Sequence, residues 1–222
     1  EGPETPPPGA EPLRGVSARI AERMDDSLSV PTATSVRTIP AKLLEVNRRI
    51  INNHLARSPA GGKVSFTHLI GWAVVRAIAD MEGMNVAYTV VDGTPHVIRH
   101  DAVNLGIAVD VTRKDGTRAL LVPNIKAADQ GDFRAFWDAY EDVIDRVRRN
   151  RITPDDFDGT TVSLTNPGML GTVQSVPRLM DDHGLIVGVG SISHPPQFEG
   201  ADPEYLARTG IGKILTITST YD

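Results

Sequence analysis

The chain has 222 residues, of which 40% are hydrophobic and 23% are charged, and its formal net charge is −5 at pH 7. This composition is typical of a soluble globular protein with one or two domains, and the acidic balance argues against a nucleic-acid-binding protein. No apolar run reaches the roughly 20 residues that a membrane-spanning helix needs, so we expect no membrane segment.

Cysteine is absent from the sequence, which excludes disulfides, thiolate metal sites and cysteine nucleophiles and fits a cytoplasmic protein. The six histidines do not form a convincing metal site, because His96 and His100 flank a predicted strand instead of sharing a helix face. We therefore predict no bound metal. The phosphate-binding pattern GxxxxGK[ST] and the nucleophile pattern GxSxG do not occur.

The first twelve residues are rich in proline, glycine and glutamate, which predicts an extended linker or a disordered terminus. A helical pattern then begins at Leu13 and ends before Pro31, and residues 30–39 are rich in the β-branched residues of a strand. Pro40 is placed to begin a second helix with an apolar stripe. A third helix starts near Thr67 and is apolar almost all round, so we expect it to be the central buried helix.

The following block predicts strands. Residues 86–91 and 96–99 flank Asp92-Gly93 as a hairpin, residues 103–111 form a longer strand, and residues 118–122 continue the sheet. Asp132 opens an amphipathic helix whose cluster of arginines at the end is expected to be solvated. Three further strands cover residues 160–165, 185–193 and 213–221. The GVG of residues 188–190 indicates close backbone packing, and the GIGK of residues 210–213 indicates a turn.

One stretch, TVSLTNPGMLGTVQSVPRL at residues 161–179, has a pattern that a simple strand does not need. Its strand ends at the polar Thr165, and the turn Asn166-Pro167-Gly168 follows directly. Reacting groups are often held at such strand ends, where a glycine-containing loop allows unusual backbone angles. A wide turn without any function is the alternative.

Several segments together carry a resemblance to a known family. They are SARIAERMDDSLSVPTAT at residues 17–34, MNVAY at 84–88, VNLGIAVDVTRKDGTRALLVPNIKAAD at 103–129, ITPDDFDGTTVSLTNPGMLGT at 152–172 and ITSTYD at 217–222. In this order and spacing they resemble the catalytic domain of 2-oxo acid dehydrogenase acyltransferases. The variant is most similar to the acyltransferase-like domain of the fused 2-oxoglutarate dehydrogenases of actinobacteria.

This resemblance implies an α/β fold like that of chloramphenicol acetyltransferase, with a mixed β-sheet flanked by helices. Residues 1–12 would be a Pro-rich linker, and residues 13–222 the acyltransferase domain. The implied reaction moves a succinyl group from a dihydrolipoamide arm to coenzyme A, at sites between subunits of a homo-oligomer. The implied partners are the lipoyl domain of another protein and the decarboxylase region of the parent chain. Thiamine diphosphate and Mg²⁺ are implied only if the parent carries that region.

The resemblance also assigns site residues. Thr165 matches the hydroxyl that stabilises the oxyanion, and Asn166, Gly168 and Asp222 are supporting candidates. The family's general base is a histidine directly after the Tyr-Asp of the last strand, and the sequence ends at Asp222, before that position. The implied domain is therefore truncated and the fragment is expected to be inactive. We interpret His183 and His194 as surface residues.

Two other functions fit the same residues. The domain can serve as a non-catalytic platform that holds the decarboxylase region and docks lipoyl partners. It can also be part of a stand-alone acyltransferase for another 2-oxo acid.

Overall fold

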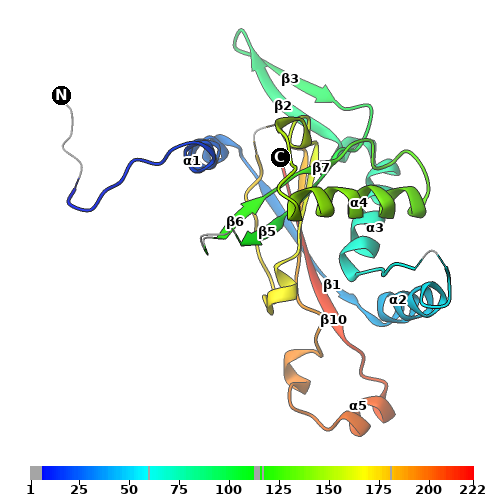
Figure 1. The fold of residues 1–222 in the computed structure, drawn as a ribbon. Coiled ribbons are helices and arrows are strands. Elements are labelled where there is room, and N and C mark those ends of the chain that lie inside the picture. Colours follow the sequence, from blue (N-terminus) through cyan, green and yellow to red (C-terminus); the bar gives the residue numbers. More distant parts are fainter. Residues whose placement is uncertain (1–6, 60, 113–115, 117, 181) are drawn as a thin grey trace.

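The computed structural model describes residues 7–59, 61–112, 116, 118–180 and 182–222. A six-stranded sheet with the order β1-β10-β9-β8-β4-β7 forms its centre (Figure 1). β8 pairs in parallel with β9 and β4, and the other pairs are antiparallel. The bounds are β1 Ala33–Pro40, β4 Leu105–Ile107, β7 Asn124–Ile125, β8 Val162–Thr165, β9 Leu185–Val189 and β10 Ile214–Tyr221.

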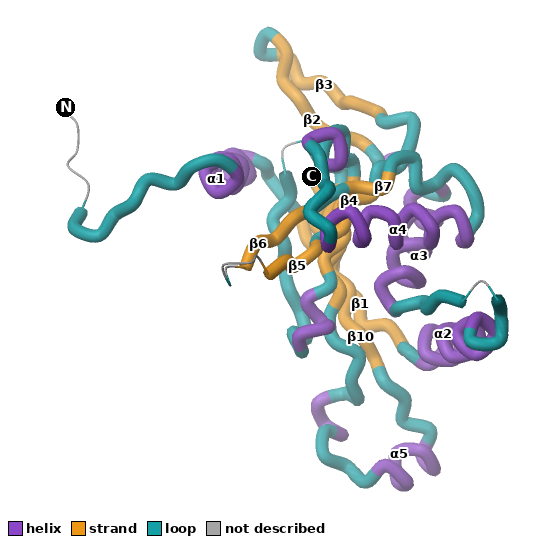
Figure 2. The backbone as a smooth tube through the Cα atoms, in the orientation of Figure 1, coloured by secondary structure: helices purple, strands orange, loops and turns teal. Residues whose placement is uncertain are grey.

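Helices pack against this mixed sheet, which confirms the predicted fold class. Figure 2 shows α2, α3 and α4 gathered on one side of the strands. The helices are α1 Val16–Asp26, α2 Lys42–Leu55, α3 Phe66–Ala79, α4 Phe133–Arg148 and α5 Pro203–Thr209. Short 3-10 helices cover Ser27–Ser29 (η1), Glu82–Met84 (η2), Pro154–Asp156 (η3), Pro167–Leu170 (η4) and Pro196–Phe198 (η5).

Helix α3 is the central buried helix, as the sequence predicts. Val75 on this helix is fully buried, and a Cβ placed at Gly71 would lie 3.2 Å from Phe136 of α4 and 3.4 Å from Leu164 of β8. Gly71 thus allows α3 to lie close to both the sheet and α4. Each fully buried aliphatic side chain of this core stabilises the fold by about 1.5–3 kcal/mol.

The helix starts follow from side chains in the sequence. Ser65 precedes α3 and its hydroxyl accepts a hydrogen bond from the His68 amide at 3.2 Å. Asp132 precedes α4 and its carboxylate accepts from the Ala135 amide at 2.9 Å. Both residues satisfy amide groups that have no partner inside the helix.

Two small two-stranded sheets extend from the central one. The hairpin of β2 Val86–Val91 and β3 Thr94–Arg99 is confirmed, with positive φ angles of 51° at Asp92 and 75° at Gly93. Such angles are those that an Asp-Gly hairpin turn requires. The hairpin projects away from the central sheet (Figure 1).

The prediction of one strand over residues 103–111 is wrong. The Ala108 amide donates its hydrogen bond to the Leu164 carbonyl of β8, and beyond this bond the chain leaves the central sheet. β5 Val109–Thr112 instead pairs with β6 Arg118–Leu121 in a separate sheet, so residues 118–122 do not continue the central one. The strand of residues 185–193 is also shorter, because β9 ends at Val189.

Apolar side chains are exposed to solvent along the outer edge of the molecule. Every residue of β1 is exposed, and none of α2 is buried. Leu43 and Ile50 of the predicted apolar stripe of α2 are 75% and 59% exposed. Exposed apolar surface of this extent is typical of an interaction surface.

Candidate functional site

The pairing register places a set of hydroxyl side chains on one face of the sheet. Thr165 pairs with Gly188, which pairs with Thr218, and Ser163 pairs with Ile186, which pairs with Thr220. Paired residues share a face, so Ser163, Thr165, Thr218 and Thr220 point away from the face that carries Leu164 and packs on α3. We call these four side chains the hydroxyl face.

Thr165 is the last residue of β8 and is partly buried at one end of this hydroxyl face. The turn that follows is held on two sides. The Asn166 side-chain amide donates to the Thr67 hydroxyl at 2.9 Å, and a Cβ at Gly168 would lie only 2.2 Å from the Gly190 carbonyl carbon and oxygen. Gly168 is therefore needed for close packing of the turn against the strand end.

The GVG of residues 188–190 packs as closely as the sequence predicts. A Cβ at Gly188 would lie 2.5 Å from the Thr218 hydroxyl, and one at Gly190 would lie 1.9 Å from the Val173 carbonyl oxygen. The Thr218 hydroxyl donates to the Ser175 carbonyl at 2.7 Å. Residues 172–179 thus lie directly on the hydroxyl face.

Next to Thr67 along α3 lies a buried histidine whose burial the sequence pattern does not predict. His68 is 2% exposed, its Nδ1 accepts from the Ser65 amide at 3.1 Å, and its Nε2 lies 3.0 Å from a carboxylate oxygen of Glu141. This arrangement holds the proton on Nε2, and burial lowers the pKa of His68 to about 4. The neutral ring packs edge-on against Tyr140, whose pKa burial raises to about 12.

Because both nitrogens of His68 have partners, His68 does not supply a free base to Thr165. Its signal in the sequence is the S-x-x-H of residues 65–68, in which the histidine takes the position that an acid or amide takes in a capping box. The prediction that His183 is a surface residue is wrong, because His183 is 7% exposed and its Nδ1 lies 3.3 Å from the Ser163 hydroxyl. His194 is half-buried.

The other candidate, Asp222, is exposed after the last residue of β10. Thr165 is on β8, level with Thr218 of β10 and two strands away from it. Asp222 lies four residues after Thr218, one residue past the end of β10. At strand spacings of about 4.8 Å and a rise of about 3.3 Å per residue, the two Cα atoms are about 16 Å apart. Within one subunit, Thr165 and the end of β10 are therefore too distant to act on one reacting group.

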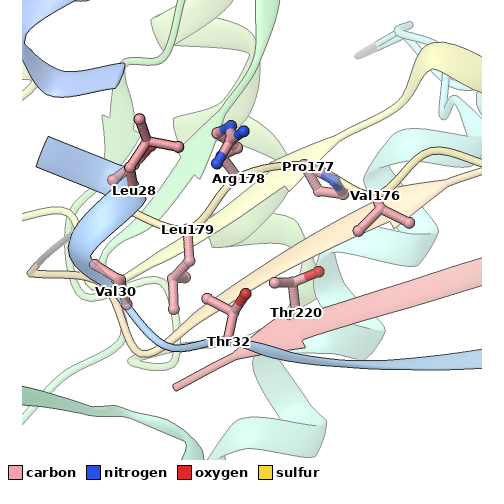
Figure 3. A pocket seen from close by; sticks show the side chains of 9 residues that line it. Leu28, Val30, Thr32, Val176, Pro177, Arg178, Leu179 and Thr220 are labelled. Atoms are coloured by element: carbon pink, nitrogen blue, oxygen red, sulfur yellow. The ribbon is translucent and has the colours of Figure 1, made fainter. Parts of the chain in front are cut away.

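Two concave regions lie near these residues. A small cavity of about 70 Å³ beside the turn is lined by Phe66, Ile70, Asn166, Gly168, Met169, Val189, Gly190 and Ile192. A larger pocket of about 310 Å³ opens on the hydroxyl face near Thr220 (Figure 3). In the part of the chain that the structure describes, no three histidine, aspartate or glutamate side chains are grouped to hold a metal ion.

Comparisons with known proteins identify the family. The model of the 2-oxoacid dehydrogenases acyltransferase (catalytic domain) family matches residues 6–222, so the chain belongs to this family. A "2-oxoglutarate dehydrogenase E1/E2 component" of Corynebacterium glutamicum is 50% identical over 220 residues, which are 99% of this chain and 18% of that protein. A "Multifunctional 2-oxoglutarate metabolism enzyme" of Mycobacterium sp. (strain JLS) is 53% identical over 210 residues, which are 95% of this chain and 16% of that protein.

Solved structures support the fold. A probable dihydrolipoamide acetyltransferase from Listeria monocytogenes has a TM-score of 0.75 at 21% identity, over 95% of this chain and 83% of that one. The dihydrolipoamide acetyltransferase of Azotobacter vinelandii has a TM-score of 0.77 at 22% identity, over 99% and 88%. The chain spans less than a fifth of the length of the curated relatives that it matches. Among the described residues, no helix is long and apolar enough to cross a bilayer.

Proposed function

We propose that this chain is the acyltransferase region of a 2-oxoglutarate dehydrogenase system and that it transfers a succinyl group from dihydrolipoamide to coenzyme A. The position of Thr165 is the main support for this proposal. Thr165 lies at a strand end on the hydroxyl face, directly before a turn that contacts Thr67 and Gly190. The identity to two relatives whose names specify 2-oxoglutarate supports the choice of the acyl group.

In this reaction the thiolate of coenzyme A attacks the carbonyl carbon of the succinyl thioester. Negative charge develops on the carbonyl oxygen, and the Thr165 hydroxyl donates a hydrogen bond to it. The intermediate then collapses, and the dihydrolipoyl sulfur leaves and takes up a proton. A preorganised donor of this kind contributes about 3–4 kcal/mol to transition-state stabilisation, and a hydroxyl can donate without changing its charge.

The base that deprotonates the coenzyme A thiol is a separate requirement, because a free thiol of pKa about 8.5 is little ionised at neutral pH. We propose that the residue after Asp222 in the full-length protein supplies it. The separation of about 16 Å between Thr165 and Asp222, which follows from the strand spacing, supports a site in which the two groups come from neighbouring subunits. Asn166 and Gly168 support the Thr165 hydroxyl, and Asp222 orients the turn that carries the base.

The lipoyl domain of a partner protein presents the acyl group. If the parent chain carries a decarboxylase region, that region would hold thiamine diphosphate and Mg²⁺ and would form the acyl group. We place the protein in the cytoplasm, with residues 1–12 as the linker into the domain and residues 13–222 as the acyltransferase unit.

The direct test is an acyl-transfer assay with succinyl-CoA and dihydrolipoamide. We expect turnover with the full-length protein, a lower rate with acetyl-CoA, and none with residues 1–222 alone. Activity of residues 1–222 that vanishes in Thr165→Ala would contradict the assigned base. A full-length protein that forms acetyl-dihydrolipoamide faster would contradict the succinyl assignment.

A second function is favoured by the exposed apolar residues of β1, α2 and the β2–β3 hairpin. In this alternative the domain is an assembly platform without transferase activity. A full-length protein that is inactive in the assay, but loses its assembled mass when residues 1–222 are deleted, would favour the platform.

A further inference from the structure

The larger pocket lies between two segments that are far apart in the sequence. Residues 27–32, which connect α1 to β1, form one part of its wall, and residues 176–179 form another. The strand β10 contributes Thr220, which is 2% exposed and belongs to the hydroxyl face. In Figure 3, Leu28 and Arg178 lie on one side of the pocket, and Thr32 and Thr220 lie on the other.

The charge in this pocket is of one sign. Its lining consists of Ser27, Leu28, Val30, Thr32, Val176, Pro177, Arg178, Leu179 and Thr220, of which Arg178 alone is ionisable at neutral pH. Among the residues that the structure describes, Arg178 forms no ion pair. By contrast, Arg134 and Arg146 of α4, and Arg149 directly after it, each pair with an aspartate four residues earlier or later. The Arg178 side chain is exposed at the rim of the pocket, where an anion can reach it.

Hydroxyl groups add donors opposite the guanidinium. Thr220 and Thr34 form a hydrogen bond at 2.9 Å between their two hydroxyl oxygens. When the Thr34 hydroxyl donates in this bond, the proton of the Thr220 hydroxyl remains for an acceptor in the pocket. The buried Leu179 and the side chains of Leu28, Val30 and Val176 add apolar surface to a wall that also contains Ser27 and Thr32.

We propose that this pocket binds the anionic end of an acyl-transfer substrate, with Arg178 as the pairing cation and the apolar wall around a short carbon chain. An arginine fork matches a carboxylate or phosphate with two parallel hydrogen bonds. The proposal rests on the transferase function above. The oxyanion is either the free carboxylate of a dicarboxylic acyl group or a phosphate of coenzyme A. The pocket lies at the Thr220 end of β10, and the proposed base follows that same end of the strand.

Ligand-observed NMR tests the proposal without turnover. We expect saturation transfer from the full-length protein to succinate, with at least tenfold weaker binding of butyrate, which has the same carbon chain and lacks the second carboxylate. Arg178→Gln should reduce succinate binding at least tenfold. Arg208→Gln, on the exposed face of α5, makes the same charge change elsewhere and should leave binding unchanged. Added salt should weaken binding by the intact protein.

A parallel titration with coenzyme A and with inorganic phosphate separates the two sources of the anion. If Arg178→Gln weakens succinate binding, the anion in the pocket is the carboxylate. If it weakens only coenzyme A binding, the anion is a phosphate. Equal binding of every ligand by Arg178→Gln and by the intact protein would overturn the proposal. Thr165→Ala should keep succinate binding, so loss of transfer in that variant and loss of binding in Arg178→Gln report on different claims.

Discussion

The Thr67 hydroxyl is the contact through which helix α3 holds the turn after Thr165. It accepts from the Asn166 amide at 2.9 Å, and Thr67 is 7% exposed. Thr67→Val keeps the shape but leaves this amide without its partner, which costs about 1–3 kcal/mol. We expect that loss in the free energy of unfolding, measured by urea titration, and a fall in kcat for succinyl transfer with little change in KM. Thr67→Ser restores the hydroxyl, so equal losses in Ser and Val variants would contradict a hydrogen-bonding role.

His68 predicts a pH dependence of stability. Its pKa is lowered to about 4 in the folded protein, from the ordinary value of 6.5, because burial of the ring disfavours its charged form. The unfolded chain therefore binds more protons between these values, and the stability contributed by the neutral ring, about 3 kcal/mol, is lost as pH falls from 6.5 to 4.

The measurement is the difference in free energy of unfolding between the intact protein and His68→Gln at several pH values. Gln can accept from the Ser65 amide without titrating, so the variant should lose less stability on acidification. Parallel curves for the two proteins from pH 7 to pH 4.5 would show that His68 is not the titrating group.

The turn after β8 packs backbone to backbone against the end of β9, where Gly168 meets Gly190. This close contact predicts that an added side chain destabilises the fold. In Gly168→Ala, the new Cβ would lie 2.2 Å from the Gly190 carbonyl, and backbone cannot move aside as a flexible side chain does. We expect a loss of about 3 kcal/mol in urea unfolding, together with loss of transfer. Gly212→Ala is the matched control, because nothing lies within 4 Å of its Cβ. Equal stability of the two variants would refute the close approach.

Local patterns in the sequence predict much of this architecture. Three predicted features depend on only a few neighbouring residues, and all three are present. They are the apolar character of α3, the Asp132 cap of α4 and the Asp92-Gly93 hairpin. The break between β4 and β5 could not be predicted, because alternation continues through Ala108 and the break depends on where β8 ends. The burial of His183 likewise depends on Ser163, twenty residues away in the chain.

The candidate site likewise has features that the sequence predicts and features that it does not. Thr165 at a strand end before a glycine turn is visible in the sequence, whereas its support by Thr67 is not, since Thr67 and Asn166 are 99 residues apart. The pocket around Arg178 joins residues 27–32 to residues 176–179 and Thr220. A single sequence gives no signal for that contact.

The distance between Thr165 and Asp222 and the exposed apolar edge together predict self-association. We expect analytical ultracentrifugation of residues 1–222 to give a mass well above the monomer mass of 23.9 kDa at micromolar concentration, and a fall in mass on dilution. A purely monomeric chain at these concentrations would contradict a site shared between copies and would favour the platform function.

The most direct test of the transferase assignment is the rate of succinyl transfer by the full-length protein with Thr165→Ala, compared with Thr165→Ser. Loss of one oxyanion donor lowers kcat by about 10²–10³. We predict a fall of this size in the alanine variant, at unchanged stability and assembled mass, and recovery of most of the activity in the serine variant. Transfer by a folded Thr165→Ala protein at the rate of the intact protein would contradict the assignment.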